Sequence, residues 1–138
     1  MTGRIEMGYR SDVAYTIRFK NKEHRIRFMA TAVLGSMINL EDFKLIDATT
    51  VLLSYEQVKW YDGYDWVKAH VQLLEDAKEQ GCGWEFCRVG EEAGDVEQDG
   101  DDGDCCEAPE LIEISQSLYI SYEGETYPIG ESLTEEDN

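Results

Sequence analysis

The sequence predicts an α+β fold with a ferredoxin-like β-α-β-β-α-β order, in which two helices cover one face of an antiparallel sheet. Several short segments alternate apolar and polar residues, as half-buried strands do. Two longer segments repeat apolar residues at helical spacing. The two kinds of segment follow one another in the β-α-β-β-α-β order. The length of 138 residues is that of one domain, so we assign 1–138 to a single domain.

The body of this domain, 7–90, begins with a strand and a helix. Residues 11–20 place Val13, Tyr15, Ile17 and Phe19 on one face, which predicts a half-buried strand. Asn21 can then cap a helix whose apolar residues recur as far as Met37. A strand over 24–29 is the alternative interpretation of the same segment.

A hairpin, a second helix and a further strand complete the body. Residues 42–47 and 51–60 are rich in β-branched, apolar and aromatic residues, which predicts a hairpin. Asp65 can cap a helix that Gly81 ends. Residues 84–89 alternate again and predict the last strand of the body.

Negative charge divides the chain into two unequal parts. Residues 1–84 carry 12 acidic and 11 basic side chains, whereas 85–138 carry 18 acidic side chains and a single basic one, Arg88. Within the second part, we expect an acidic loop at 91–108, an extra C-terminal strand at 109–122 and a flexible acidic tail at 131–138. A part with net charge −17 repels nucleic acid and anionic lipid, and attracts basic protein surfaces. We therefore expect neither nucleic acid nor a membrane as a direct partner.

No catalytic, cofactor or metal site is predicted. His70 lies on the apolar side of its helix, where a hydrogen-bonded core histidine is the usual interpretation. Residues 95–106 resemble an EF-hand calcium loop in their spaced acids, but the twelfth position, which needs a bidentate Glu, is Cys106. We therefore do not predict an EF-hand site. The four cysteines lack the paired knuckles of a zinc site and are expected to be reduced thiols. Since no long apolar run or signal peptide is present, we expect a cytosolic protein.

Three short motifs resemble a group of small acidic tailed-phage proteins. They are Met7-Gly-Tyr-Arg-Ser-Asp-Val13, Lys59-Trp-Tyr61 followed by Tyr64-Asp-Trp-Val67, and Phe86-Cys-Arg-Val-Gly-Glu91 before an acidic stretch. The segment before Met7 departs from the usual start of the group. The resemblance implies a phage origin, and hence the host cytoplasm, but no mechanism.

These observations together predict an acidic, non-enzymatic phage protein that inhibits a host nucleic-acid-handling or defence protein by occupying its basic surface. The expected partner-binding residues are the acids of the second part and two tyrosines: Glu85, Glu91, Glu92, Asp95, Glu97, Asp99, Asp101, Asp102, Asp104, Glu107, Tyr61 and Tyr64. DNA mimicry would need strand-borne acids such as Glu85, Glu110 and Glu113 to lie beside the loop on one folded face, because alternate residues of an extended loop are about 7 Å apart. Duplex DNA carries about one charge per 1.7 Å of its axis. The alternative is a virion-associated or assembly protein that oligomerises, as a dimer for example, through a sheet edge.

Overall fold

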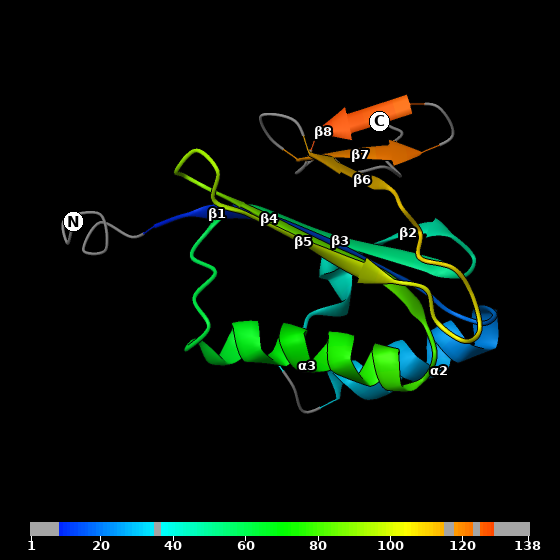
Figure 1. Cartoon of the computed structure of the whole chain (residues 1–138). Coiled ribbons are helices and arrows are strands. Elements are labelled where there is room, and N and C mark those ends of the chain that lie inside the picture. The colour runs from blue at the N-terminus through cyan, green and yellow to red at the C-terminus, as the bar shows by residue number, and fades with distance from the viewer. Residues whose placement is uncertain (1–8, 35–36, 115–117, 123–124, 129–138) are drawn as a thin grey trace.

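The computed structural model describes residues 9–34, 37–114, 118–122 and 125–128, and they form three layers (Figure 1). Two helices cover one face of a five-stranded antiparallel sheet, and a small three-stranded sheet lies over the opposite face. The α+β class with two helices on one face is therefore confirmed.

The chain alternates strands and helices before its acidic part begins. Its elements are β1 (Ser11–Arg18), α2 (Lys22–Val33), a short 3₁₀ helix (Leu40–Asp42), β2 (Phe43–Asp47), β3 (Thr50–Val58), α3 (Asp65–Glu79), β4 (Gly83–Gly90) and β5 (Val96–Asp101). The large sheet has the order β2-β3-β1-β4-β5, and every neighbouring pair is antiparallel. It thus departs from the predicted ferredoxin-like arrangement, because a fifth strand extends one edge.

The prediction of an acidic loop over 91–108 was wrong for its middle. Residues Val96–Asp101 form β5, in register with β4 from Val89 opposite Val96 to Trp84 opposite Asp101. Acidic residues and glycine disfavour strands, but that preference is weak compared with the main-chain hydrogen bonds that an open strand edge offers. The tertiary context therefore overrides the local composition.

The prediction of one C-terminal strand at 109–122 was also wrong. The segment forms two antiparallel strands, β6 (Ile112–Ile114) and β7 (Leu118–Tyr122), and β7 pairs further with β8 (Glu125–Pro128). Alternating apolar residues continue from one strand into the next, so periodicity does not reveal where the chain reverses. The predicted flexible tail at 131–138 lies outside the described residues.

Local signals placed two of the four helix ends correctly, and the predicted extension of the first helix to Met37 was wrong because α2 ends at Val33. The Asn21 side chain accepts a hydrogen bond from the His24 N–H (2.8 Å), which confirms the first cap and excludes the alternative strand over 24–29. Gly81, at φ +81°, ends the second helix as predicted. The predicted cap by Asp65 was wrong, since α3 begins at Asp65 itself and Tyr64 precedes it without a side-chain cap.

Each face of the large sheet has its own apolar cluster. Tyr15, Ile17, Leu53 and Trp84 face the helices, where they pack against Leu73 and other residues of α2 and α3. On the opposite face a smaller cluster joins Ala14, Ile46, Leu52 and Cys87 to Ile112 of β6. The small sheet is thus attached through an apolar contact.

Glu85 adds a polar attachment at the same place. Its side chain is 8% exposed and faces the small sheet. Glu85 Oε2 accepts hydrogen bonds from the Thr16 hydroxyl (2.9 Å) and the Leu111 N–H (2.6 Å). Its Oε1 accepts a longer one from the Ile112 N–H (3.4 Å). One buried carboxyl group thereby holds the start of β6 against β1 and β4.

We expect Glu85→Ala to destabilise the protein by about 2–4 kcal/mol, because buried donors lose their acceptor at about 1–3 kcal/mol each. Urea unfolding measures the loss, and amide exchange at Leu111 and Ile112 should accelerate. The exposed Glu113 of β6 supplies the control, since Glu113→Ala should change stability by less than about 0.5 kcal/mol. Equal stability of the two variants would contradict the attachment.

Candidate functional site

Three of the acidic residues that the sequence singles out, Glu97, Asp99 and Asp101, lie on β5 at one edge of the large sheet. Every residue of β5 is exposed, and among the described strands β5 pairs only with β4. Glu97, Asp99 and Asp101 lie opposite Arg88, Phe86 and Trp84, so they share the face that carries the helices. Successive members of this row are about 6.8 Å apart along the strand.

Arg88 neutralises the acids at the start of the hairpin. Its guanidinium forms ion pairs with Asp95 Oδ1 (2.7 Å) and Glu97 Oε1 (2.6 Å), and it also donates to the Ser11 hydroxyl (3.0 Å). Hydrogen bonds from Arg88 and then from Tyr9 lower the pKa of Asp95. These two carboxylates therefore hold the hairpin together, and Asp95 in particular is only partly exposed.

The other acids near the β4–β5 turn also have neighbours within the chain. Glu91 accepts a hydrogen bond from the Arg10 N–H (2.7 Å), and the Glu92 N–H donates to the Tyr9 hydroxyl (3.0 Å). Glu85, which we expected on the partner-binding surface, is buried beneath the small sheet. The sequence-predicted set is thus divided between internal contacts and a smaller exposed group.

The exposed group is Asp99, Asp101, Asp102 and Asp104, which we call the acidic edge. It borders a hollow of about 390 Å³ beside Trp84 and Lys78. The first three of these acids also line a second hollow, of about 550 Å³, that reaches Glu110. Asp99 and Asp102 each accept a hydrogen bond from a nearby backbone N–H, which fixes their orientation. Glu107 is exposed in the segment that follows.

Tyr61 and Tyr64 lie toward the other end of β5. Their ring centroids are 5.1 Å apart, and Tyr64 is 39% exposed. The Tyr61 hydroxyl accepts a hydrogen bond from the Tyr9 N–H (2.6 Å), and the Tyr9 hydroxyl donates to Asp95. The tyrosine pair is therefore connected to the β4–β5 turn through Tyr9.

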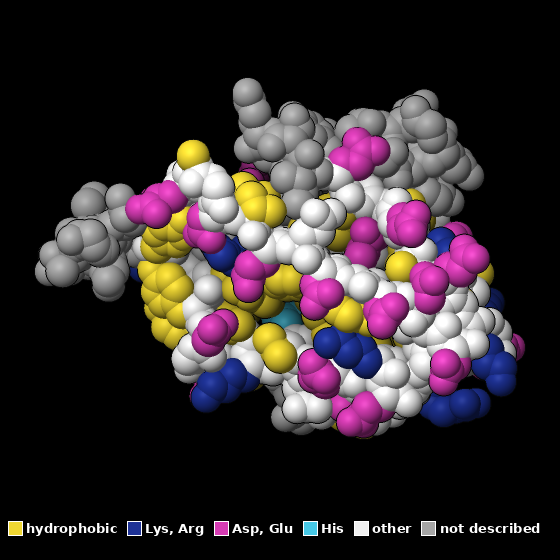
Figure 2. All heavy atoms as spheres, viewed as in Figure 1, with side chains coloured by type: hydrophobic (Ala, Val, Ile, Leu, Met, Phe, Trp, Pro, Cys, Tyr) yellow, Lys and Arg dark blue, Asp and Glu magenta, His cyan; other side chains and the backbone are white. Residues whose placement is uncertain are grey.

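The space-filling view shows the consequence for the surface (Figure 2). Hydrophobic side chains gather at the end of the molecule where the β4–β5 turn and the start of α3 lie, and acidic side chains spread from there along the β5 side. The tyrosine pair is linked to the β4–β5 turn through Tyr9, and the acidic edge lies at the far end of β5. Glu85 is buried and Glu113 belongs to the small sheet, whereas the exposed Glu110 lines the second hollow beside the acidic edge.

A chain of hydrogen bonds crosses the core beneath β1 and β3. The Tyr55 hydroxyl donates to Asp42 Oδ2 (2.6 Å) and lies 3.4 Å from His70 Nε2, while the Tyr15 hydroxyl lies 2.6 Å from His70 Nδ1. Since Tyr55 gives its proton to Asp42, its oxygen accepts from Nε2–H, and Nδ1 then accepts from Tyr15. His70 is therefore the tautomer that carries its proton on Nε2.

Burial determines the protonation states of the side chains in this series of hydrogen bonds. His70 is 2% exposed and Tyr15 is fully buried. Desolvation lowers the pKa of His70 to about 4, and it raises the pKa values of Tyr15 and Tyr55. The prediction of a hydrogen-bonded core histidine is confirmed, and sequence spacing could not have identified its partners on β1, β3 and the 3₁₀ helix.

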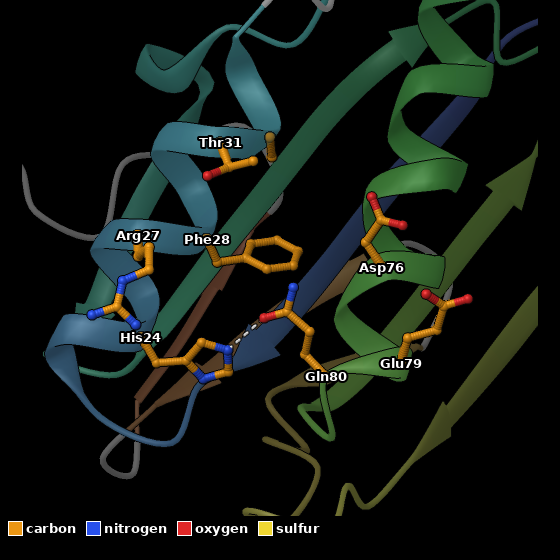
Figure 3. A pocket seen from close by; sticks show the side chains of 8 residues that line it. His24, Arg27, Phe28, Thr31, Asp76, Glu79 and Gln80 are labelled. Atoms are coloured by element: carbon orange, nitrogen blue, oxygen red, sulfur yellow. Dashed lines mark hydrogen bonds between the residues drawn. The ribbon is translucent and has the colours of Figure 1, made fainter.

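A polar cleft of about 360 Å³ separates the two helices (Figure 3). His24 of α2 points toward Gln80 at the end of α3, and His24 Nε2 lies 2.7 Å from Gln80 Oε1. Asp76, on the α3 side, accepts a hydrogen bond from Gln72 of its own helix (2.9 Å). The His24–Gln80 contact bridges the helices across this cleft.

The four cysteines are free thiols. Burial raises the pKa of Cys82 and of Cys87 to about 12, and it also raises the pKa of Cys105. Thiols with such values are protonated at neutral pH and are weak nucleophiles. Among the described residues, no group of three or more His, Cys, Asp or Glu side chains is arranged to hold a metal ion.

We expect His70 to make stability depend on pH. In the unfolded chain His70 binds a proton below its ordinary pKa of about 6.5, whereas in the folded protein it stays neutral to about pH 4. The contribution of His70 to the free energy of unfolding is therefore complete above pH 6.5. About 3 kcal/mol of that free energy is lost as the pH falls from 6.5 toward 4.

Urea unfolding of the wild type and of His70→Gln at several pH values tests this expectation. The variant should be less stable than the wild type at pH 7. The difference between their free energies of unfolding should shrink by about 3 kcal/mol at pH 4, because only the wild type loses the contribution of His70 while the carboxylates affect both proteins equally. Parallel curves for His70→Gln and the wild type would contradict the buried neutral histidine.

No helix in the described part of the chain is long and apolar enough to cross a membrane. Comparison of the chain with protein-family models, with curated proteins and with solved structures found no match.

Proposed function

We propose that this chain is a non-enzymatic binding protein that uses the acidic edge to occupy a basic surface of a nucleic-acid-handling protein. The observation that carries this proposal is the exposure of four aspartates on and directly after an edge strand, where Arg88 does not reach them. The resemblance to small acidic tailed-phage proteins implies a phage origin but no mechanism. From that origin we infer that the target belongs to a bacterial host, and we propose that occupying its basic surface inhibits it, as for a defence protein.

The edge strand gives these charges a defined geometry. A disordered acidic loop would lose conformational entropy on binding, whereas β5 is already paired with β4 along its whole length. Lysine or arginine side chains of a partner can enter the hollows on either side of the acidic edge. Exposed ion pairs contribute about 0.2–1 kcal/mol each, so four of them contribute roughly 1–4 kcal/mol and accelerate association.

Charge density limits how far the acidic edge can imitate DNA. One strand of duplex DNA presents a charge about every 3.4 Å of the axis, twice the density of the row on β5. Asp102 and Asp104 raise the density at one end only. The acidic edge therefore substitutes for a short stretch of a single phosphate backbone, and the exposed Tyr64 supplies an aromatic contact for specificity.

The assembly alternative would have to use a different edge. Two β5 strands from separate molecules would bring like charges together, which opposes edge-to-edge pairing. Oligomerisation through the large sheet would therefore require β2, at its opposite edge.

The triple variant Asp99→Asn, Asp101→Asn, Asp102→Asn tests the proposal. Asparagine keeps the oxygens that accept backbone hydrogen bonds, so the variant should fold while losing three charges. Proteins captured from host lysate by the immobilised wild type should be retained poorly by the variant. For a captured protein, displacement of labelled duplex DNA should need about 10–100 times more variant than wild type, and the wild-type effect should weaken as salt rises.

The matched control removes three exposed acids elsewhere, through Glu23→Gln, Glu41→Gln and Glu56→Gln. It changes the net charge equally but should displace DNA like the wild type. If both triple variants lose activity equally, net charge and not the acidic edge governs binding. If the wild type displaces no DNA at low salt, the proposed function is wrong.

A further inference from the structure

The opposite edge of the large sheet has a different chemistry. Among the described strands, β2 pairs only with β3, so its other side offers unpaired main-chain N–H and C=O groups. A groove of about 310 Å³ lies between this edge and α2. Its apolar lining comes mainly from Ile26, Met29, Leu40, Phe43, Leu45 and Val51.

Apolar exposure is concentrated around this groove. Of the eight large hydrophobic side chains that are exposed in the described residues, five lie on α2, on β2 or in the connection between them: Ile26, Leu34, Met37, Leu40 and Leu45. Ile26 and Leu45, from the two walls of the groove, are 49% and 47% exposed. Such a concentration beside an open strand edge is typical of an interaction site.

The charges in the groove wall are positive. Arg25 of α2 and Lys44 of β2 are its charged residues, and no acid contributes to the lining. The acidic edge lies four strand spacings away, at about 19 Å, which exceeds the screening length of about 8 Å at physiological ionic strength. Arg25 and Lys44 therefore favour an acidic ligand at the groove itself, against the nearby charges of Glu41, Asp42 and Asp47 and the charge of −18 on the whole chain.

The register of β2 defines what a ligand would meet on each face. Phe43 and Leu45 lie opposite Leu53 and Val51, which belong to the cluster under the helices. Lys44 lies opposite Leu52, which belongs to the cluster on the other face. An added strand would thus direct alternate side chains into the apolar groove and the intervening ones toward the face of Lys44.

We propose that this groove binds an extended peptide segment of a partner protein, which adds to β2 as a sixth strand. The segment alternates apolar and acidic residues: the apolar side chains enter the groove between Ile26 and Leu45, and the acidic ones lie beside Lys44. Main-chain hydrogen bonds to β2 supply affinity and the alternating pattern supplies specificity, as in other cases of strand addition. A second copy of the chain is a poorer occupant, because pairing of two β2 edges would place Arg25 and Lys44 of one molecule beside the same residues of the other.

Selection from a displayed library of random linear octapeptides against the purified full chain tests this site. The enriched peptides should alternate apolar and acidic residues. In fluorescence anisotropy, Ile26→Glu or Leu45→Glu should weaken binding of a selected peptide at least tenfold. Both positions are about half exposed, and circular dichroism verifies that the variants fold. The bound peptide should also slow amide exchange in β2.

Val96→Glu is the matched control, since Val96 is 43% exposed on the other edge strand and should tolerate the change without loss of peptide binding. The site is contradicted if no peptide is enriched, if enriched peptides lack the alternation, or if Val96→Glu weakens binding as much as Leu45→Glu. Sedimentation of the wild type adds a further check: a dimer that Leu45→Glu dissociates would identify a second copy as the occupant and overturn the proposal. Because none of these variants alters the acidic edge, the result is independent of the proposed function.

Discussion

The ion pairs of Arg88 make the acidic half of this chain compatible with a folded sheet. Arg88 is the single basic residue between 85 and 138, and it pairs with Asp95 and Glu97 at the start of β5. Without that cation, the start of the hairpin would bring carboxylates together with, among the contacts of the described residues, only the hydrogen bonds from Tyr9 to Asp95 and from the Arg10 N–H to Glu91 to stabilise them. Because the Arg88 guanidinium is already paired with these two carboxylates, Asp95 and Glu97, it does not neutralise the exposed acids farther along β5. The same residue thus orders the strand and leaves its far end charged.

The two edges of the large sheet consequently differ in the partners that they favour. The β5 edge presents aspartates and is protected from self-pairing by their repulsion. The β2 edge presents apolar side chains with Arg25 and Lys44. The sheet separates these surfaces by a distance greater than the screening length. If both proposals hold, one small domain would bind a basic surface and an acidic peptide at once.

Buried polar groups determine how the layers are held on this sheet. The chain from Tyr15 through His70 and Tyr55 to Asp42 joins α3 and the 3₁₀ helix to β1 and β3. Glu85 performs the corresponding role on the opposite face for the small sheet. Buried polar groups are costly unless they are hydrogen-bonded, so each of these contacts favours one arrangement of the layers over others.

Short-range patterns in the sequence were sufficient for part of this structure. Alternation identified β1 and β4, Asn21 identified the start of α2, and Gly81 identified the end of α3, because each signal acts within a few residues of the chain. Composition also located the negative charge correctly in the second part of the chain. The same patterns predicted the α+β class, because apolar periodicity reflects which face of each element is buried.

Other features were decided only by contacts between distant segments. The composition of 96–101 predicted a loop. In the folded protein this segment is a strand, because it pairs with the open edge of β4 and Arg88 forms an ion pair with Glu97. Glu85 looked like part of the acidic surface until the packing of β6 buried it. The groove beside β2 arises from α2 and β2 together and has no signature in either segment alone. The sequence by itself determined which residues prefer water, which are charged, where α2 begins and where α3 ends. The tertiary structure decided which acids stay exposed, because pairing and burial depend on neighbours that the chain brings together only when it folds.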